Sequence, residues 1–193
     1  MRKILFSLLA LLIIPALTPS VSADEYSAAL EELAGNQIKG WAQSSEVVSA
    51  IMAQNKKSAS LDQAAIDSLD KKWRAETKGG DKSMINAVLS NSLSAYLKNI
   101  KEQSEGLYTE IFVMDNKGLN VGQSDVTSDY WQGDEGKWQK SFGAGPSGQL
   151  IDDVEFDDSS QTYQSQVSIA IVDPASNEPI GAVTVGVNVE ALE

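Results

Sequence analysis

The spacing of apolar residues changes near the middle of the sequence, from a helical period to an alternating one. In residues 24–55 the apolar side chains recur at near-helical intervals, which predicts a long helix that Gly35 and Gly40 weaken in its middle. A second helix is predicted after Ser60, and Gly79 and Gly80 end it. The apolar positions of these two helices are Tyr26, Leu30, Leu33, Trp41, Val48 and Ile51, then Leu61, Ala65, Leu69 and Trp73.

A third helix is predicted to begin at Asp81 as its N-cap and to end before Gly106. Its apolar residues form one stripe, as expected of a helix that packs on a core: Ile85, Val88, Leu89, Leu93, Tyr96, Leu97 and Ile100. Gly106 therefore closes a helical half, residues 24–105.

From residue 107 onward the alternation predicts five strands of an antiparallel sheet, separated by turns rich in Asp, Asn, Ser and Gly. The strands are 108–114, 119–123, 147–156, 161–172 and 180–189. One face is apolar and carries Val167, Ile169 and the valines of the last strand. The other, which we call the mixed face, carries Gln164, Gln166, Ser168, Ala182, Thr184, Gly186 and Asn188. The predicted fold class is α+β, with N-terminal helices followed by this sheet.

The first residues have the features of a bacterial signal peptide. Arg2 and Lys3 precede an apolar run that is too short to span a membrane, and Val21-Ser22-Ala23 matches a cleavage site. We expect residues 1–23 to be removed and 24–193 to form one domain in the periplasm of a Gram-negative bacterium. Thirteen basic and twenty-seven acidic residues then remain, a balance of −14 that disfavours nucleic acid and anionic lipid.

The sequence contains no His and no Cys, which removes the usual routes to catalysis and metal binding. Ser-His-Asp and Cys-His sites cannot form, and neither can zinc sites with Cys ligands or disulfides. No cofactor is expected, and we expect the protein not to be an enzyme. The acidic run of Asp152, Asp153, Glu155, Asp157 and Asp158 leaves a Ca²⁺ site open, but a charged strand face and turn is the favoured interpretation.

Three segments resemble extracytoplasmic Cache/PDC sensor domains, which have a PAS-like fold. They are MDNKG from Met114 to Gly118, DYWQGDEGKWQ from Asp129 to Gln139, and the last two strands, QSQVSIAIVD and PIGAVTVGVNV. The resemblance implies a small-molecule site between the sheet and the segment that connects its second and third strands, here residues 124–145. We call these residues the connecting segment.

The predicted ligand-binding residues are Asp129, Tyr130, Trp131, Lys137, Trp138 and Tyr163. Trp138 and Phe142 stand four residues apart on a helix predicted from Asp134, and a role in packing is an equal alternative for Trp138. Aromatic side chains in the loop before that helix are harder to explain by packing.

The resemblance also implies what the site would lack. Amino-acid-binding members of the family place an Arg where this sequence has Gly136, and the mature chain has only Arg74, in the helical half. An amine or another small polar metabolite is therefore favoured over a carboxylate ligand, because aromatic rings and carboxylates suit a cation. Lys137 or backbone N–H groups are the alternative anion ligands.

Two functions remain open. One is a periplasmic binding or sensing module without an output domain of its own, which passes its signal to a partner such as a membrane-bound receptor or kinase. The other is a non-catalytic interaction or inhibitor protein that uses the same fold without a small ligand.

Overall fold

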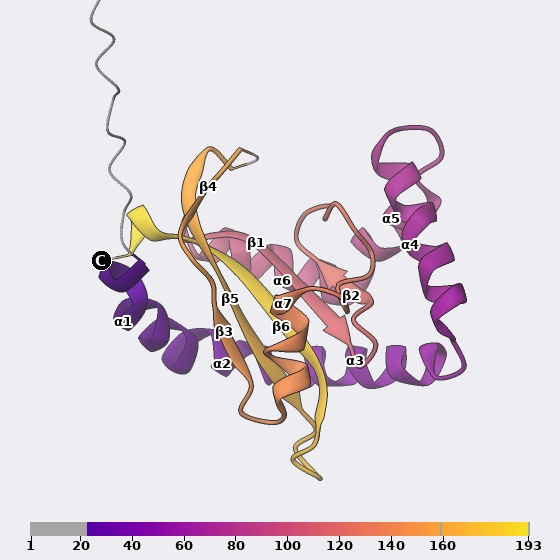
Figure 1. The fold of residues 1–193 in the computed structure, drawn as a ribbon, viewed down its shortest axis with the longest axis horizontal. Coiled ribbons are helices and arrows are strands. Elements are labelled where there is room, and N and C mark those ends of the chain that lie inside the picture. The colour runs from indigo at the N-terminus through magenta and orange to yellow at the C-terminus, as the bar shows by residue number, and fades with distance from the viewer. Residues whose placement is uncertain (1–22, 159, 193) are drawn as a thin grey trace, which may run out of the picture.

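The computed structural model describes residues 23–158 and 160–192, which form a helical half followed by an antiparallel sheet (Figure 1). The helical half contains α1 (Ala23–Leu33), the π-helical turn η1 (Ala34–Ile38), α2 (Lys39–Ala42), α3 (Ser45–Ser58), α4 (Gln63–Thr77), α5 (Ser83–Leu89) and α6 (Ser92–Gln103). The predicted signal peptide lies outside the described residues, except for Ala23, with which α1 begins. No helix in the described ranges is long and apolar enough to cross a membrane.

The long N-terminal helix is interrupted close to the predicted position. The π-helical turn η1 contains Gly35, and α2 ends at Ala42. The break comes just after Gly40, where the hydroxyl of Ser44 accepts a hydrogen bond from the Val47 N–H at 3.4 Å and starts α3. Helix α3 then continues to Ser58, three residues beyond the predicted end.

The third predicted helix is two helices, and its N-cap is not Asp81. Asn91 separates α5 from α6, because its side chain accepts from the Ser94 N–H at 2.8 Å and donates to the Val121 carbonyl at 2.8 Å. At the start of α5, the carboxylate of Glu76 accepts from the backbone N–H groups of Met84 and Ile85 at 2.9 and 3.0 Å. A carboxylate from the preceding helix thus takes the place of a local cap.

The sheet half contains β1 (Tyr108–Asp115), β2 (Asn120–Gln123), β3 (Gln149–Ile151), β4 (Glu155–Asp157), β5 (Thr162–Val172) and β6 (Pro179–Asn188), with α7 (Gly136–Gln139), η2 (Phe142–Ala144) and η3 (Val189–Ala191). The order is β2-β1-β6-β5-β3, and β4 also pairs with β5. The expected strand 147–156 is therefore two short strands that pair in turn with β5. The other predicted strands and turns agree to within a residue or two.

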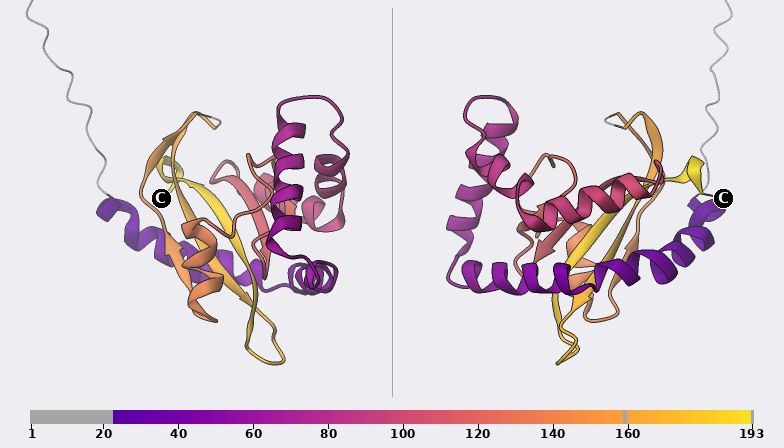
Figure 2. Two further views of the ribbon diagram at one scale, coloured as in Figure 1. Left: turned by 45° about the vertical axis from the view of Figure 1, so that its right-hand side comes forward. Right: turned by 180° about the vertical axis from the view of Figure 1, so that it is seen from behind.

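The apolar face of the sheet packs on the N-terminal helices, as the alternation predicts. Figure 2, seen from behind, shows α1, α3 and α6 across this face. The core there joins Leu30, Ile38, Ile51 and Leu97 to Val167, Ile169, Val183, Val185 and Val187. Helices α4 and α5, which we call the helical arm, stand at the β2 end and have a second core around Trp73 and Tyr130. On the opposite face of the sheet, α7 lies in front of β5 and β6 (Figure 1).

Candidate functional site

The connecting segment is attached to the mixed face through Trp138. The indole N–H donates to the Asp115 carbonyl at 3.1 Å, and the ring stacks on Phe142 with centroids 4.9 Å apart. Both rings pack against a small buried cluster, Phe112, Met114 and Ala182. The predicted same-side pair is therefore present, although α7 is only the four residues Gly136–Gln139 and begins two residues later than expected. Trp138 fixes the segment to the sheet.

Lys137 extends its ammonium group over the mixed face. The nitrogen lies 5.5 Å from the centroid of the Phe112 ring and 2.8 Å from a carboxylate oxygen of Glu135. The side chain is 17% exposed, so the charge is partly removed from water. An ammonium group within about 6 Å of an aromatic face is stabilised by the ring quadrupole. This part of the mixed face thus has the groups that hold a cation.

Glu110 adds a second carboxylate on the same face. The amide of Gln166 donates to it at 2.9 Å, and burial raises the pKa of Glu110, while the positive charge of Lys137 opposes that rise. Gly186 leaves the space for this side chain, because a Cβ there would lie 2.9 Å from Glu110 Cγ. A neighbouring pair of hydroxyls, Ser168 and Thr184, is hydrogen-bonded at 2.9 Å. Sequence reasoning missed Glu110, although its position two residues before Phe112 places it on this face.

Gln123 is a further polar group on the mixed face that the sequence did not single out. Its Cα pairs with that of Phe112, and its side chain is 0% exposed. The carbonyl oxygen accepts from Thr127 at 3.3 Å, whereas the amide nitrogen has no hydrogen-bond partner among the described residues. A buried N–H group without an acceptor is costly, which marks this position as one where an acceptor would be stabilising.

The loop residues predicted to contact a ligand are bound to the helical arm. Asp70 accepts from the backbone N–H groups of Tyr130 and Trp131 at 2.9 and 3.1 Å. The Tyr130 ring stacks on Trp73 at 5.5 Å between centroids, and the Trp73 N–H donates to the Thr127 carbonyl at 2.8 Å. Burial raises the pKa of Tyr130 to about 12. These aromatic residues are therefore packed, contrary to the expectation of exposed loop side chains.

Arg74 belongs to the same contact. Its guanidinium group lies 2.6 Å from Asp70 and 2.5 Å from Asp129, so both of its carboxylate partners come from the chain itself. The indole N–H of Trp131 donates to the Lys117 carbonyl at 2.8 Å, and the ring borders an open depression of about 490 Å³ beside Arg74. The helical half thus contributes its one Arg to anchoring the connecting segment, and not to the mixed face.

Tyr163 lies apart from the other predicted site residues. It is 40% exposed and lies near the start of β5, where its ring makes an edge-to-face contact with Phe156 at 5.3 Å between centroids. Strand alternation places it on the face that carries Val167, away from the mixed face. The six predicted residues therefore occupy three places, and their ligand-binding role stays a prediction.

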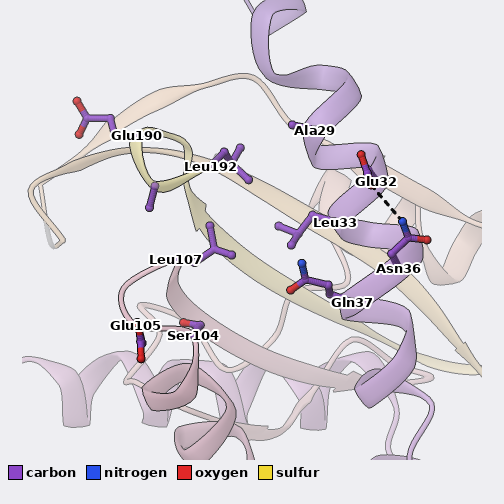
Figure 3. A pocket seen from close by; sticks show the side chains of 11 residues that line it. Ala29, Glu32, Leu33, Asn36, Gln37, Ser104, Glu105, Leu107, Glu190 and Leu192 are labelled. Atoms are coloured by element: carbon purple, nitrogen blue, oxygen red, sulfur yellow. Dashed lines mark hydrogen bonds between the residues drawn. The ribbon is translucent and has the colours of Figure 1, made fainter.

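The acidic run does not form a metal site in the described residues, and a further depression lies beside α1. In residues 23–158 and 160–192 no three Asp or Glu side chains come together in a geometry that would hold a metal ion. A depression of about 640 Å³ lies between α1, η1, the turn before β1 and η3, with Leu33, Leu107 and Leu192 directed into it (Figure 3). Its rim carries Glu32 and Glu190, and neither Lys137 nor Glu110 lines it.

The chain is similar to solved sensor domains over most of its length, at TM-scores below 0.5. It is 12% identical to the sensor domain of the histidine kinase DctB from V. cholerae, with a TM-score of 0.44, and the match covers 88% of this chain and 57% of that one. For the ligand-binding domain of the Campylobacter jejuni chemoreceptor Tlp3 in complex with 4-methylisoleucine, the identity is 16%, the TM-score 0.41 and the coverage 89% and 58%.

The E. coli DcuS sensor domain is 19% identical, with a TM-score of 0.39, over 65% of this chain and 92% of that one. The chain spans less than two thirds of the length of the DctB and Tlp3 domains. No family model matches the sequence, and no curated protein is similar to it. The resemblance to Cache/PDC sensor domains that the sequence indicates is accompanied by structural similarity to these solved sensor domains.

Proposed function

We propose that the chain is an extracytoplasmic sensor domain that binds a small polar ligand, cationic or neutral, between the mixed face and the connecting segment. The observation that carries this proposal is the position of the Lys137 ammonium over the Phe112 ring, beside the carboxylate of Glu135 and in the field of Glu110. The protein is proposed to be non-catalytic and to reach the periplasm through the signal peptide.

The chain's own lysine occupies the position that a ligand ammonium would take. A partly exposed ion pair contributes about 1 kcal/mol, and a cation over an aromatic ring about 0.5–2 kcal/mol, so displacing Lys137 costs about 1.5–3 kcal/mol. A ligand ammonium would regain the same ring contact and the carboxylate of Glu110. Because Lys137 projects from a helix of only four residues, its side chain can turn toward solvent without disturbing a long element.

The polar groups around this position suit a small ligand with hydrogen-bond acceptors as well. The unpaired amide nitrogen of Gln123 and the hydroxyls of Ser168 and Thr184 lie on the same face of the sheet. Lys137 and Trp138 would contact the ligand directly. Asp129, Tyr130 and Trp131 would act by holding the connecting segment against the helical arm.

A thermal-shift screen against amines, amino acids, dicarboxylates and divalent ions tests the proposal. A ligand at a hundredfold excess over its dissociation constant adds about 2.7 kcal/mol to the free energy of unfolding, which is a clear shift in melting temperature. We expect amines to stabilise the protein and to change the fluorescence of Trp138. Stabilisation by a dicarboxylate alone would contradict the proposed ligand class.

One variant, compared with a matched control, distinguishes the possible roles of Lys137. If its ammonium occupies the ligand's place, Lys137→Gln strengthens amine binding; if it binds a ligand carboxylate, the same change abolishes binding. Lys140→Gln is the matched control, since Lys140 is exposed on the next turn and forms no described ion pair. A screen in which no compound raises the melting temperature would favour the second function, an interaction or inhibitor protein without a small ligand.

A further inference from the structure

The sheet has an open edge at β4, away from the helices. Strand β4 pairs with β5 on one side, and no other described strand pairs with it. Figures 1 and 2 show β4 standing clear of the helices, near one end of the long strand β5. On its outer side, an edge strand can pair its backbone N–H and C=O groups with an added strand.

The two sides of this edge have opposite chemical character. Phe156 and Tyr163 are cross-strand partners, 49% and 40% exposed, with their rings in edge-to-face contact. Their neighbours Glu155 and Gln164 are also cross-strand partners and point to the other side. One side of the edge is therefore aromatic and the other acidic and polar.

The charge of this region has one sign only. Residues 141–193 contain nine acidic residues and no Lys or Arg. Asp152, Asp153, Glu155 and Asp157 border a depression of about 260 Å³ together with Phe156 and two glutamines. In the part of the chain that the structure describes, no basic side chain is ion-paired with Asp152, Asp153 or Glu155.

We propose that the β4 edge binds an extended basic segment of a partner protein, in which basic and apolar residues alternate. Side chains of an added strand point alternately to the two faces, so its apolar residues would lie beside Phe156 and Tyr163. Its Lys or Arg residues would then face Glu155 and Asp153 on the other side. The charges select this partner over a second copy of the chain, because two such acidic edges repel each other.

Protection of the edge against aggregation explains the acidic residues but not the aromatic pair. Charged residues on an edge strand suffice to prevent edge-to-edge pairing. Two adjacent, half-exposed aromatic rings at the same edge oppose that protection, because exposed apolar surface favours association with other chains. Aromatic rings beside acidic side chains are instead typical of protein–protein interfaces. The rings provide contact area, and the charges provide selectivity for the partner.

The test uses the full mature chain and a fluorescently labelled, end-blocked peptide of alternating Lys and Val, about six residues long. Fluorescence anisotropy gives the affinity of this peptide for the unmodified protein and for variants. A Glu-Val peptide of equal length is the control. We expect the Lys-Val peptide to bind and the Glu-Val peptide not to. Phe156→Thr should weaken binding about tenfold, whereas Val126→Thr, at an equally exposed apolar position elsewhere, should leave it unchanged.

Charge reversal provides a second, independent variant. Asp153→Lys with Glu155→Lys should switch the preference to the Glu-Val peptide, while Asp67→Lys on α4 with Glu178→Lys in the turn between β5 and β6, which changes the net charge equally at exposed positions away from β4, should not. Equal binding to all variants would overturn the proposal, because the attraction would then come from the net charge alone. Absence of Lys-Val binding would overturn it as well. Sedimentation that shows a dimer lost in Phe156→Thr would replace the basic partner with a second copy of the chain.

Discussion

Asp70→Ala should release the connecting segment from the helical arm. The Asp70 side chain is 13% exposed and accepts three hydrogen bonds, from the N–H groups of Tyr130 and Trp131 and from Arg74. A truncation to Ala removes all three and leaves Arg74 with Asp129 as its carboxylate partner. The backbone N–H groups of Tyr130 and Trp131 then lose their acceptor on α4.

The expected decrease in the free energy of unfolding follows from the strength of hydrogen bonds to charged groups, which contribute about 1.5–3 kcal/mol each. The two backbone bonds together give about 3–6 kcal/mol, and the exposed pair with Arg74 adds at most about 1 kcal/mol. Because freed N–H groups regain some water, we expect a loss near the lower limit, about 3 kcal/mol. For a domain of this size that corresponds to a melting temperature about 6–12 °C lower.

Urea denaturation measures this loss, and hydrogen exchange locates it at the amides of Tyr130 and Trp131. Asp67→Ala is the matched control, because Asp67 lies on the same helix and makes only an exposed contact with Gln63. We expect this control to cost less than about 0.5 kcal/mol. A difference between the two variants below about 0.5 kcal/mol, or unchanged exchange at the two amides, would refute the anchoring role of Asp70.

Three further outcomes are expected. Because burial raises the pKa of Glu110, its contribution to stability is present below the unfolded pKa of about 4.3 and is lost as pH rises through the folded pKa; Glu110→Gln should therefore flatten the fall in melting temperature with rising pH. Gly118→Ala should cost more than about 1 kcal/mol in urea denaturation, since φ is +80° and a Cβ would lie 2.5 Å from the Gly133 nitrogen, whereas Gly40→Ala, with open space in a helix, should stabilise. The intact mass of the periplasmic protein should correspond to a chain that starts at Asp24, and recovery of the full-length chain would show that cleavage does not occur.

The alternation of the second half was sufficient to predict the sheet. Strand period, the Asp115–Gly118 turn and the split into an apolar and a mixed face are local properties of the sequence, and each is present in the structure. The third helix was mispredicted because the cause of its division is not local. Asn91 ends one helix and caps the next while its amide bonds the Val121 carbonyl, thirty residues away.

The candidate site was predicted less well, for a related reason. Tyr130 and Trp131 lie in a loop, and nothing in the surrounding sequence shows that Asp70 of α4 binds their backbone or that Trp73 stacks on Tyr130. Glu110 and Gln123 were missed because each is one polar residue in a strand. Alternation places Glu110 on the face of Phe112, but only the sheet register shows that Gln123 lies beside that ring. Lys137 and Trp138 lie over the sheet in the structure, and their ligand-binding role stays a prediction.

The connecting segment has one anchor at the arm and one at the sheet, and the contacts of Lys137 are weaker than either. At the arm, Asp70 and Trp73 contribute three hydrogen bonds to backbone groups of residues 127–131, and at the sheet Trp138 contributes one hydrogen bond and a buried stack. Lys137 is held by a partly exposed ion pair and a ring contact, each worth about 1 kcal/mol. Local opening takes the path of lowest free energy, so it begins at Lys137 and leaves both anchors intact. A ligand that replaces this one ammonium group therefore needs no rearrangement of the fold, and any larger movement of the segment on binding would have to break the hydrogen bonds that Asp70 of the arm accepts from Tyr130 and Trp131.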